Sequence, residues 1–460
     1  MNQDTLYPAL DTIVHPETVQ EAVSQAGNLG VSDHTGLIIA IMGLLIFAAH
    51  LFTEIFSRKR IPDVLMLMAI GLIVGPVLGW VKPESLGAVA SVFTTVTLVI
   101  ILFESGTELN FNTLLNSIKG TMKLTTINFF VTMVVVALLG IVFEKFDILT
   151  SLMLGAILGG TSSAVVIPMV SQLKISEKGG TILILESAFS DVLCIVFAWA
   201  FLKAVQSGSM SVGPVIGSII ASFILSSIIG LASAILWSYL LNKIRHVKNS
   251  ILTTPAFVFI VYGINQWFGF SGAIAALAFG IGMANIDYMY DKGVFLKRMF
   301  KEQPVKLNDT ERQLFSEVVF LLKTFFFVYI GISIRLDHFW PILIGFIITL
   351  VLFALRIPIV RASVHKEKGE FPTEDKMFMS GIVPKGLAAA VLATIPVQQG
   401  LPGGDIIQNI VFAVILFSIT FTSIMVPVLE HDNAVSRFYR RCFEHPDDPS
   451  ITDLLDQEQA

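Results

Sequence analysis

The chain has 460 residues, of which 54% are hydrophobic and only 14% are charged, and its formal net charge is -5. Soluble domains carry about a quarter charged residues, so this composition excludes an ordinary soluble protein and predicts one that lies in the lipid bilayer. The small net charge gives no sign of a nucleic-acid partner. The two cysteines, Cys194 and Cys442, match no metal or disulfide spacing, and we expect no cofactor.

The first 35 residues are polar. They lack the basic start and the apolar core of a signal peptide, and they carry several acidic residues, such as Asp4 and Glu17. We interpret residues 1–35 as a polar leader that lies outside the membrane.

Apolar segments then recur along the chain from residue 36 to residue 430. A helix needs about 20 apolar residues to cross roughly 30 Å of hydrocarbon, and thirteen such spans are predicted. They cover 36–56, 62–81, 87–104, 122–143, 150–172, 181–203, 211–242, 251–269, 271–286, 313–334, 338–360, 377–397 and 405–430. The region 36–430 is therefore one transmembrane domain, followed by a short tail at 431–460.

Lys and Arg residues set the expected orientation of the spans. Of the 30 such residues, 23 follow odd-numbered spans, 4 follow even-numbered spans, and the remaining 3 lie within spans. Because basic residues stay on the cytoplasmic side, we expect the N-terminus outside and the C-terminal tail in the cytoplasm. The location predicted from this is the cell inner (plasma) membrane, crossed many times.

A few charged residues fall within the predicted spans. Each costs at least about 2.5–3.5 kcal/mol at the centre of the bilayer, so such residues are candidates for function. Span six carries Glu186 and Asp191, while spans ten, eleven and twelve carry Lys323, Arg356 and Lys385.

The two acids of span six point in different directions. Five residues along a helix turn it by about 500°, so their side chains lie roughly 140° apart. Asp191 shares a face with Ser187, and Glu186 shares one with Ser190. We interpret Glu186 as the partner of the buried Arg356, and Asp191 as a free carboxylate that faces a cavity. The alternative is that both acids belong to ion pairs that only hold the bundle together.

Two spans contain residues that break helices. If the long seventh span is set aside, they are the fifth members of two halves, spans 1–6 and 8–13. Interrupted segments in corresponding positions indicate a transporter site, although small residues also serve ordinary helix packing. The interrupting residues are Gly159-Gly160-Thr161-Ser162-Ser163 with Pro168 in span five, and Gly381, Pro384-Lys385-Gly386 and Pro396 in span twelve.

These residues suggest a mechanism. Thr161, Ser162 and the exposed carbonyl groups of broken helices offer oxygen atoms to a partly dehydrated Na⁺, K⁺ or Li⁺, and Asp191 offers the counter-charge. Ser187 and Ser190 of span six are further candidates for this ion- and proton-binding site. Asp191 would hold either the cation or a proton, which predicts antiport. Lys385 would be a fixed positive charge that offsets converging carbonyl groups.

At these residues the sequence resembles the monovalent cation/proton antiporter superfamily, of the Na⁺/H⁺ exchanger type, over essentially all thirteen spans. The acid–x4–(Asn or Asp)–Asp element of that family corresponds to Glu186 through Asp191, and its arginine segment to Arg356 through Val360. Its Pro-Arg-Gly segment corresponds to Pro384-Lys385-Gly386, with lysine for arginine.

The resemblance implies an all-α polytopic fold of about 13 transmembrane helices. They would form two inverted six-helix repeats, with crossed broken helices at spans five and twelve. It also implies ion binding by Asp191, hydroxyl ligands from Thr161 and Ser162, a structural ion pair of Glu186 with Arg356, and a homodimer.

The sequence departs from the family at two places. Ser190 stands where the family usually has Asn or Asp, and Thr161-Ser162-Ser163 is closer to the Kef-like potassium branch than to many Na⁺/H⁺ exchangers. The cation therefore stays open. With one titratable carboxylate the exchange should be electroneutral, unless Lys323 or Lys385 also releases a proton.

The alternatives to a Na⁺ or K⁺ antiporter are a Kef-like potassium efflux system and a cation channel. We expect no enzyme, because the sequence contains neither a His-Glu-x-x-His nor a Gly-x-Ser-x-Gly motif.

Overall fold

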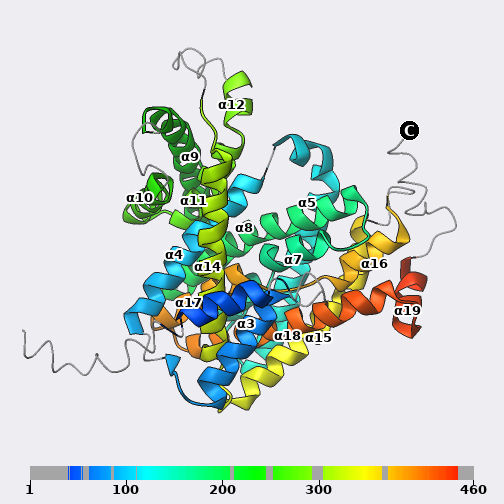
Figure 1. Cartoon of the computed structure of the whole chain (residues 1–460). Helices are drawn as coiled ribbons and strands as arrows, with labels where there is room; N and C mark the ends of the chain where they lie inside the picture. Colours follow the sequence, from blue (N-terminus) through cyan, green and yellow to red (C-terminus); the bar gives the residue numbers. More distant parts are fainter. Residues whose placement is uncertain are drawn as a thin grey trace, which may run out of the picture. The chain divides into compact units, whose positions relative to one another are not determined.

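The computed structural model describes residues 40, 42–52, 54, 62–83, 87–109, 111–207, 212–244, 252–292, 304–364 and 371–443. All regular secondary structure in these residues is helical (Figure 1). The chain divides into two compact units, Met1–Glu54 and Ile55–Ala460. In the first unit, Met42–Phe52 is a short apolar helix. The predicted leader and residues 444–460 of the predicted tail lie outside the described residues.

The second unit contains the remaining helices. In chain order they are α3 (Asp63–Leu72), which continues as the π-helix η1 (Ile73–Val77), α4 (Gly87–Glu108), α5 (Phe111–Leu139), which continues as η3 (Gly140–Glu144), α6 (Ile148–Ile157), α7 (Ser163–Val170), α8 (Glu177–Ser207), α9 (Val212–Ile244), α10 (Thr253–Trp267), α11 (Gly272–Ala284), α12 (Ile286–Lys292), α14 (Asp309–Ser333), α15 (Phe339–Val364), α16 (Thr373–Gly381), α17 (Leu387–Gln398), α18 (Gly404–Glu430) and α19 (Ala434–Phe443).

Six of the described helical segments are long and apolar enough to cross a membrane. They are Thr121–Glu144, Glu177–Gln206, Ala221–Leu241, Asp309–Ser333, Phe339–Val364 and Gly404–Glu430. Shorter apolar helices occupy other predicted spans, and both spans with helix-breaking residues are divided, into α6 with α7 and into α16 with α17. The multi-pass helical architecture is therefore present, while the count of thirteen spans and their inverted repeat stay predictions.

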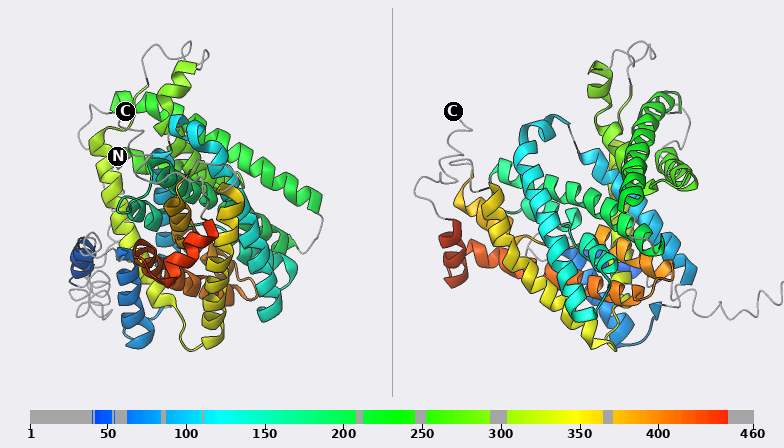
Figure 2. Two further views of the ribbon diagram at one scale, coloured as in Figure 1. Left: turned by 90° about the vertical axis from the view of Figure 1, so that its right-hand side faces the viewer. Right: turned by 180° about the vertical axis from the view of Figure 1, so that it is seen from behind.

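The helices of the second unit pack as two groups. The first group contains α3, α4, α9, α10, α11 and α14, and the second contains α5 to α8 and α15 to α19. Packing is close within each group and sparser between the two groups. In the left view of Figure 2, α9 of the first group is the long green helix. One polar contact between the groups joins the end of α14 to α18, where the Asn409 side chain accepts from the Arg335 backbone N–H at 3.1 Å.

Glycines bring backbones of the first group into direct contact. A Cβ atom added to Gly280 of α11 would lie 2.1 Å from the carbonyl oxygen of Phe103 in α4. One added to Gly331 of α14 would lie 2.2 Å from the carbonyl oxygen of Met68 in α3. Because no side chain fits at either crossing, the backbones of these two helix pairs are in direct contact.

Three details differ from the sequence-based expectation. The third predicted span was taken to end at residue 104, but α4 continues to Glu108, and Gly106 in this last turn lies against the backbone of α11. Lys376 was counted with the loop residues, yet it lies in α16 and is buried. The tail was expected to be only a tail, whereas its residues Ala434–Phe443 form the amphipathic helix α19.

Candidate functional site

The two broken helix pairs cross at their interrupted segments. Between α6 and α7, and between α16 and α17, the chain leaves the helical conformation for a few residues. There the backbone N–H of Ser162 donates to the carbonyl oxygen of Pro384 at 2.8 Å. A Cβ atom on Gly386 would lie 2.0 Å from the hydroxyl oxygen of Ser162, so the crossing needs glycine at this position.

Hydroxyl groups of intact neighbouring helices hold the interrupted segments in place. Ser190 of α8 accepts from the backbone N–H of Thr161 at 3.0 Å and donates to the carbonyl oxygen of Ser187 at 3.0 Å. Ser418 of α18 accepts from the backbone N–H of Lys385 at 2.9 Å. Both segments thus find the backbone partners that an unwound chain needs away from water.

Lys385 links one broken helix to the carbonyl end of the other. Its Nζ atom donates to the carbonyl oxygen of Gly160, just beyond α6, at 2.7 Å, and its side chain is buried. A cation at the C-terminal end of a helix offsets the partial negative charge of the free carbonyl groups. Lys385 therefore lies where the sequence analysis expected a fixed charge, with a carbonyl group as its hydrogen-bond partner.

Asp191 lines a pocket at the crossing. Its walls come from α4, from the first turns of α7 and α17, and from Asp191 in α8; the lining residues are Leu98, Ile101, Leu102, Ser162, Ser163, Ala164, Asp191, Leu387 and Ala388. Because α4 belongs to the first helix group and the others to the second, the pocket lies at the boundary between the groups.

Two polar groups at this pocket have unused hydrogen-bonding capacity. Within the described residues, no side chain forms a hydrogen bond or ion pair with Asp191. The hydroxyl of Ser162 is buried and likewise has no hydrogen-bond partner there. Asp191 is half-buried and Ser162 is buried. A polar group that is shielded from water and has no partner costs free energy, so this carboxylate and this hydroxyl together favour a cation, which the oxygen atoms of both groups can bind.

Glu186 and Arg356 form a fully buried ion pair. The two guanidinium nitrogens Nη1 and Nη2 donate to the two carboxylate oxygens at 2.5 and 2.6 Å, and Nε donates to the carbonyl oxygen of Met379 at 2.9 Å. Both side chains have 0% exposure. Such a fork-to-fork pair joins α8, α15 and α16 and leaves neither group available to an ion.

The other residues named from the sequence lie in different surroundings. The Ser187 hydroxyl donates to the carbonyl oxygen of Ile184 in its own helix at 2.8 Å and is absent from the pocket lining. Thr161 is buried in the interrupted segment. Lys323 lies in the first helix group, where its Nζ atom forms an ion pair with Asp63 at 3.0 Å.

Sequence reasoning passed over three acids near span ends, of which Asp63 and Asp375 are buried and Glu104 is half-buried. Asp63 and Glu104 fall at the ends of predicted spans, and Asp375 falls just before one, and none of the three was considered as a candidate. Asp63 is the partner of Lys323. Asp375 is fully buried and accepts from the backbone N–H of Ser176 at 3.1 Å, which fastens α16 to the segment before α8. A search for acids within one turn of a span end would have found them.

A family model described as "Sodium/hydrogen exchanger, transmembrane" matches residues 41–431. The chain belongs to this family. The match covers nearly all the described helices, including both broken pairs and the helix that carries Glu186 and Asp191.

Two K(+)/H(+) antiporters are among the proteins with related sequences. The K(+)/H(+) antiporter NhaP2 of Shewanella sp. (strain ANA-3) is 22% identical over 398 residues, which is 84% of this chain and 65% of the relative. The K(+)/H(+) antiporter NhaP of Alkalimonas amylolytica is 24% identical over 392 residues, again 84% of this chain and 65% of the relative. The chain therefore spans less than two thirds of these relatives' length.

A solved structure shares the fold. The sodium proton antiporter MjNhaP1 from Methanocaldococcus jannaschii superimposes with a TM-score of 0.68 at 20% sequence identity, covering 85% of this chain and 99% of that chain. By sequence, the Na(+)/H(+) antiporter 1 of the same organism is 27% identical over 165 residues, 35% of this chain and 38% of that protein.

Proposed function

We propose that this protein is a monovalent cation/proton antiporter in which Na⁺ or K⁺ competes with a proton for Asp191. The observation that carries the proposal is the position of Asp191. It is an acidic side chain without a partner among the described residues, beside the unpaired Ser162 hydroxyl, where two broken helices cross. We propose neither an enzymatic activity nor a cofactor for this site.

The competition follows from the cost of burying charge. A carboxylate held away from water needs either a proton or a neighbouring cation. Asp191 has no cationic partner in the described structure, since Lys385 bonds to Gly160 and Arg356 is taken by Glu186. A cation that binds Asp191 must displace the proton, and Ser162 adds an oxygen ligand.

Alternating access requires the site to face each side of the membrane in turn. The pocket is walled by α4 from one helix group and by α7, α8 and α17 from the other. We therefore propose that movement of one group against the other opens the pocket first to one side and then to the other, with the broken helices carrying the ion.

The proposed exchange is electroneutral. Ser190 holds no charge, Glu186 is paired with Arg356, and Lys323 is paired with Asp63. Of the charged residues at the crossing of the broken helices, Asp191 is then the carboxylate left to exchange one cation for one proton. In proteoliposomes the exchange rate should not change when a membrane potential is imposed with an ionophore that does not carry the transported ion. A strong response to the potential would show that a second group, such as Lys385, releases a proton.

The remaining features are proposed on the resemblance and on the distribution of charge. The protein would be a homodimer in the inner (plasma) membrane, with its N-terminus outside and its C-terminus in the cytoplasm. Light scattering in detergent tests the dimer. Labelling of single cysteines placed in the two termini, from each side of the membrane, tests the orientation.

The decisive experiment is exchange by purified protein in vesicles that contain a pH-reporting dye. Addition of Na⁺, K⁺ or Li⁺ should dissipate an imposed pH gradient, and the comparison of the three identifies the cation. Asp191→Asn should reduce exchange to the level of empty vesicles. The control Lys145→Gln, at an exposed position that does not line the Asp191 pocket, should exchange normally. Normal pH-dependent exchange by Asp191→Asn would overturn the site, and current without a pH gradient would indicate a channel.

A further inference from the structure

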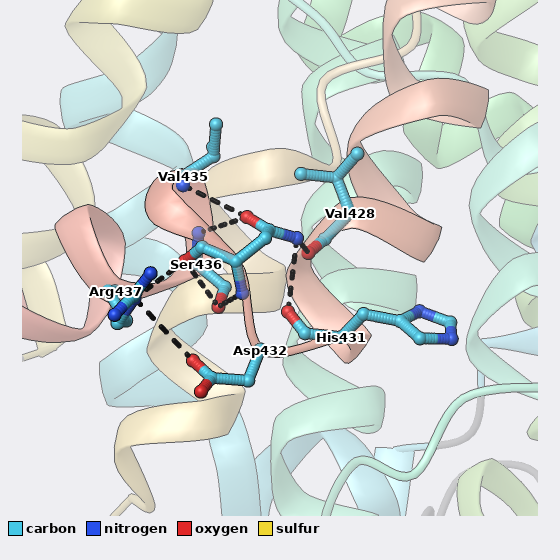
Figure 3. Close-up of polar contacts among 7 residues, drawn as sticks. Val428, His431, Asp432, Val435, Ser436 and Arg437 are labelled. Atoms are coloured by element: carbon cyan, nitrogen blue, oxygen red, sulfur yellow. Dashed lines mark hydrogen bonds and ion pairs between the residues drawn. The ribbon is translucent and has the colours of Figure 1, made fainter.

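Hydrogen bonds join the amphipathic helix α19 to the end of α18, the last predicted span. The Asn433 side chain bridges α18 and α19, and Figure 3 shows its partners Val428 and Val435 on the two sides of this junction. Its Nδ2 atom donates to the carbonyl oxygens of Val428 at 2.5 Å and His431 at 3.1 Å, and its Oδ1 atom accepts from the backbone N–H groups of Val435 and Ser436, each at 2.9 Å. α18 is long and apolar enough to cross a membrane, and a bilayer crossed by α18 would have one surface near the start of α19.

One face of α19 rests on the protein. Ser436, Tyr439 and Phe443 are buried, and α19 packs against α16 and α18. At about 100° per residue, these three positions share one side of the helix. This contact and the Asn433 bridge together determine which other faces of α19 point away from the protein.

The two remaining faces have opposite character. Val435 and Phe438 are 41% and 57% exposed, and Cys442 lies on their side of the helix. Three arginines are exposed on the opposite flank of the packed face, across from Val435 and Phe438; they are Arg437, Arg440 and Arg441. By helical geometry the centres of the apolar and the arginine faces are roughly 140° apart.

The arginines have little carboxylate pairing within the described residues. Arg437 lies 3.8 Å from Asp432, and the side chains of both are more than half exposed, so water screens this contact. No ion pair is found there for Arg440 or Arg441. A helix at the bilayer surface with one apolar face and one basic face is suited to lie in the interface, with its aromatic side chain among the acyl chains and its basic groups at the headgroups.

We infer that α19 is a binding surface for anionic phospholipids. Val435 and Phe438 would enter the boundary of the acyl chains, and the arginines would contact the lipid phosphates. A soluble acidic protein would explain the arginines but not the exposed Phe438 beside the end of a membrane span. The inference concerns lipid binding, and its test does not depend on the proposed transport activity.

Cys442 provides a probe for the test. In the Cys194→Ala protein it is the only cysteine, so a fluorophore attached to it reports the surroundings of the apolar face. The full chain is placed in nanodiscs of phosphatidylcholine with increasing phosphatidylglycerol, some of it carrying a nitroxide quencher near the headgroup. Quenching should rise with the phosphatidylglycerol fraction.

Two triple variants separate lipid binding from loss of net charge. Each arginine should contribute roughly a fivefold factor to the affinity of α19 for an anionic lipid surface. The variant with Arg437→Gln, Arg440→Gln and Arg441→Gln should therefore bind phosphatidylglycerol about a hundredfold more weakly. The control, Lys174→Gln with Arg312→Gln and Arg361→Gln, removes three exposed charges elsewhere and should respond like the unchanged protein. Thermal unfolding confirms that both variants fold.

The inference is overturned if quenching is independent of phosphatidylglycerol, or if both triple variants respond alike. A probe at Cys442 that lipid quenchers do not reach and that aqueous iodide does would also overturn it, and would point instead to a soluble partner or to none. Phosphatidylglycerol retained in native mass spectra, and lost in the arginine variant alone, would support it by a second measurement.

Discussion

Glu186 and Asp191 are acids of the same helix with different surroundings. Because they are five residues apart, one faces α15 and the other faces the crossing of the broken helices. Arg356 meets Glu186 with two short hydrogen bonds, whereas no described side chain bonds to Asp191. A separation along one helix thus assigns one carboxylate to structure and leaves the other available for an ion.

Glu186→Gln should destabilise the protein by about 3–5 kcal/mol, because it leaves the charge of Arg356 buried without its partner. Thermal unfolding in detergent measures the effect. Asp191→Asn is the matched control and should leave the unfolding midpoint nearly unchanged, since Asp191 bonds to no described side chain. Equal midpoints for both variants would contradict the assignment of Glu186 to structure.

Side-chain contacts could be predicted where both partners had been recognised as charged residues within spans. The pair of Glu186 with Arg356 was expected because a buried arginine needs an acid, and the helical spacing left Glu186 as the better placed one. The partner of Lys323 was not expected, since Asp63 is distant in sequence and lies at a span end. The bond from Lys385 to Gly160 required knowing how the two broken spans cross.

At the level of elements, the crossing depends on small side chains as much as on breaks in the helices. Pro384 cannot donate a backbone hydrogen bond, and its carbonyl oxygen accepts from Ser162 instead. Glycine at 386 lets the two segments touch. Both breaks were visible in the sequence, because glycine and proline mark them, whereas the close contact between Gly386 and Ser162 was not.

Gly386→Ala should destabilise the protein by about 1–3 kcal/mol through overpacking and should lower exchange, because its Cβ atom meets the Ser162 hydroxyl. Adding Ser162→Gly should restore much of the unfolding midpoint but not the exchange rate, since the hydroxyl ligand is then gone. Gly217→Ala is the control, because no atom lies within 4 Å of the added Cβ. Full exchange by Gly386→Ala would argue against a tight crossing.

On the scale of the whole molecule, the division into two helix groups is what the sequence could not reveal. Hydropathy located the helices, and their order along the chain suggested two halves. The observed groups, however, each draw helices from both halves: α3 and α14 belong together, as do α5 and α18. Which helices become neighbours is decided by contacts such as those at Gly280 and Gly331, between residues far apart in the sequence.

If the groups move against each other, joining them should stop exchange. The pair Arg335→Cys and Asn409→Cys, in a background without Cys194 and Cys442, replaces the contact between α14 and α18 at a distance from the Asp191 pocket. A short, reducible bifunctional thiol reagent should abolish exchange, and reduction should restore it. Loss of exchange that reduction does not reverse would indicate damage instead of a lock.

The control joins two parts of the same group. Gly140→Cys and Ser151→Cys both belong to the second group, and a Cβ atom at Gly140 would lie 3.6 Å from that of Ser151, which suits a disulfide. Cross-linking this pair should leave exchange intact. If it stops exchange as completely as the first pair, movement between the groups is not the reason for the loss.

The glycine contacts of the first group also affect how a survey of every possible substitution would look. Gly280 and Gly331 touch backbone atoms, so any side chain there must push two helices apart. If Asp191 binds the ion as proposed, such positions should tolerate replacement as poorly as Asp191, although neither lines the pocket at Asp191. A screen that scores only growth would therefore merge scaffold and ion ligand into one class, and surface abundance would be needed to tell them apart.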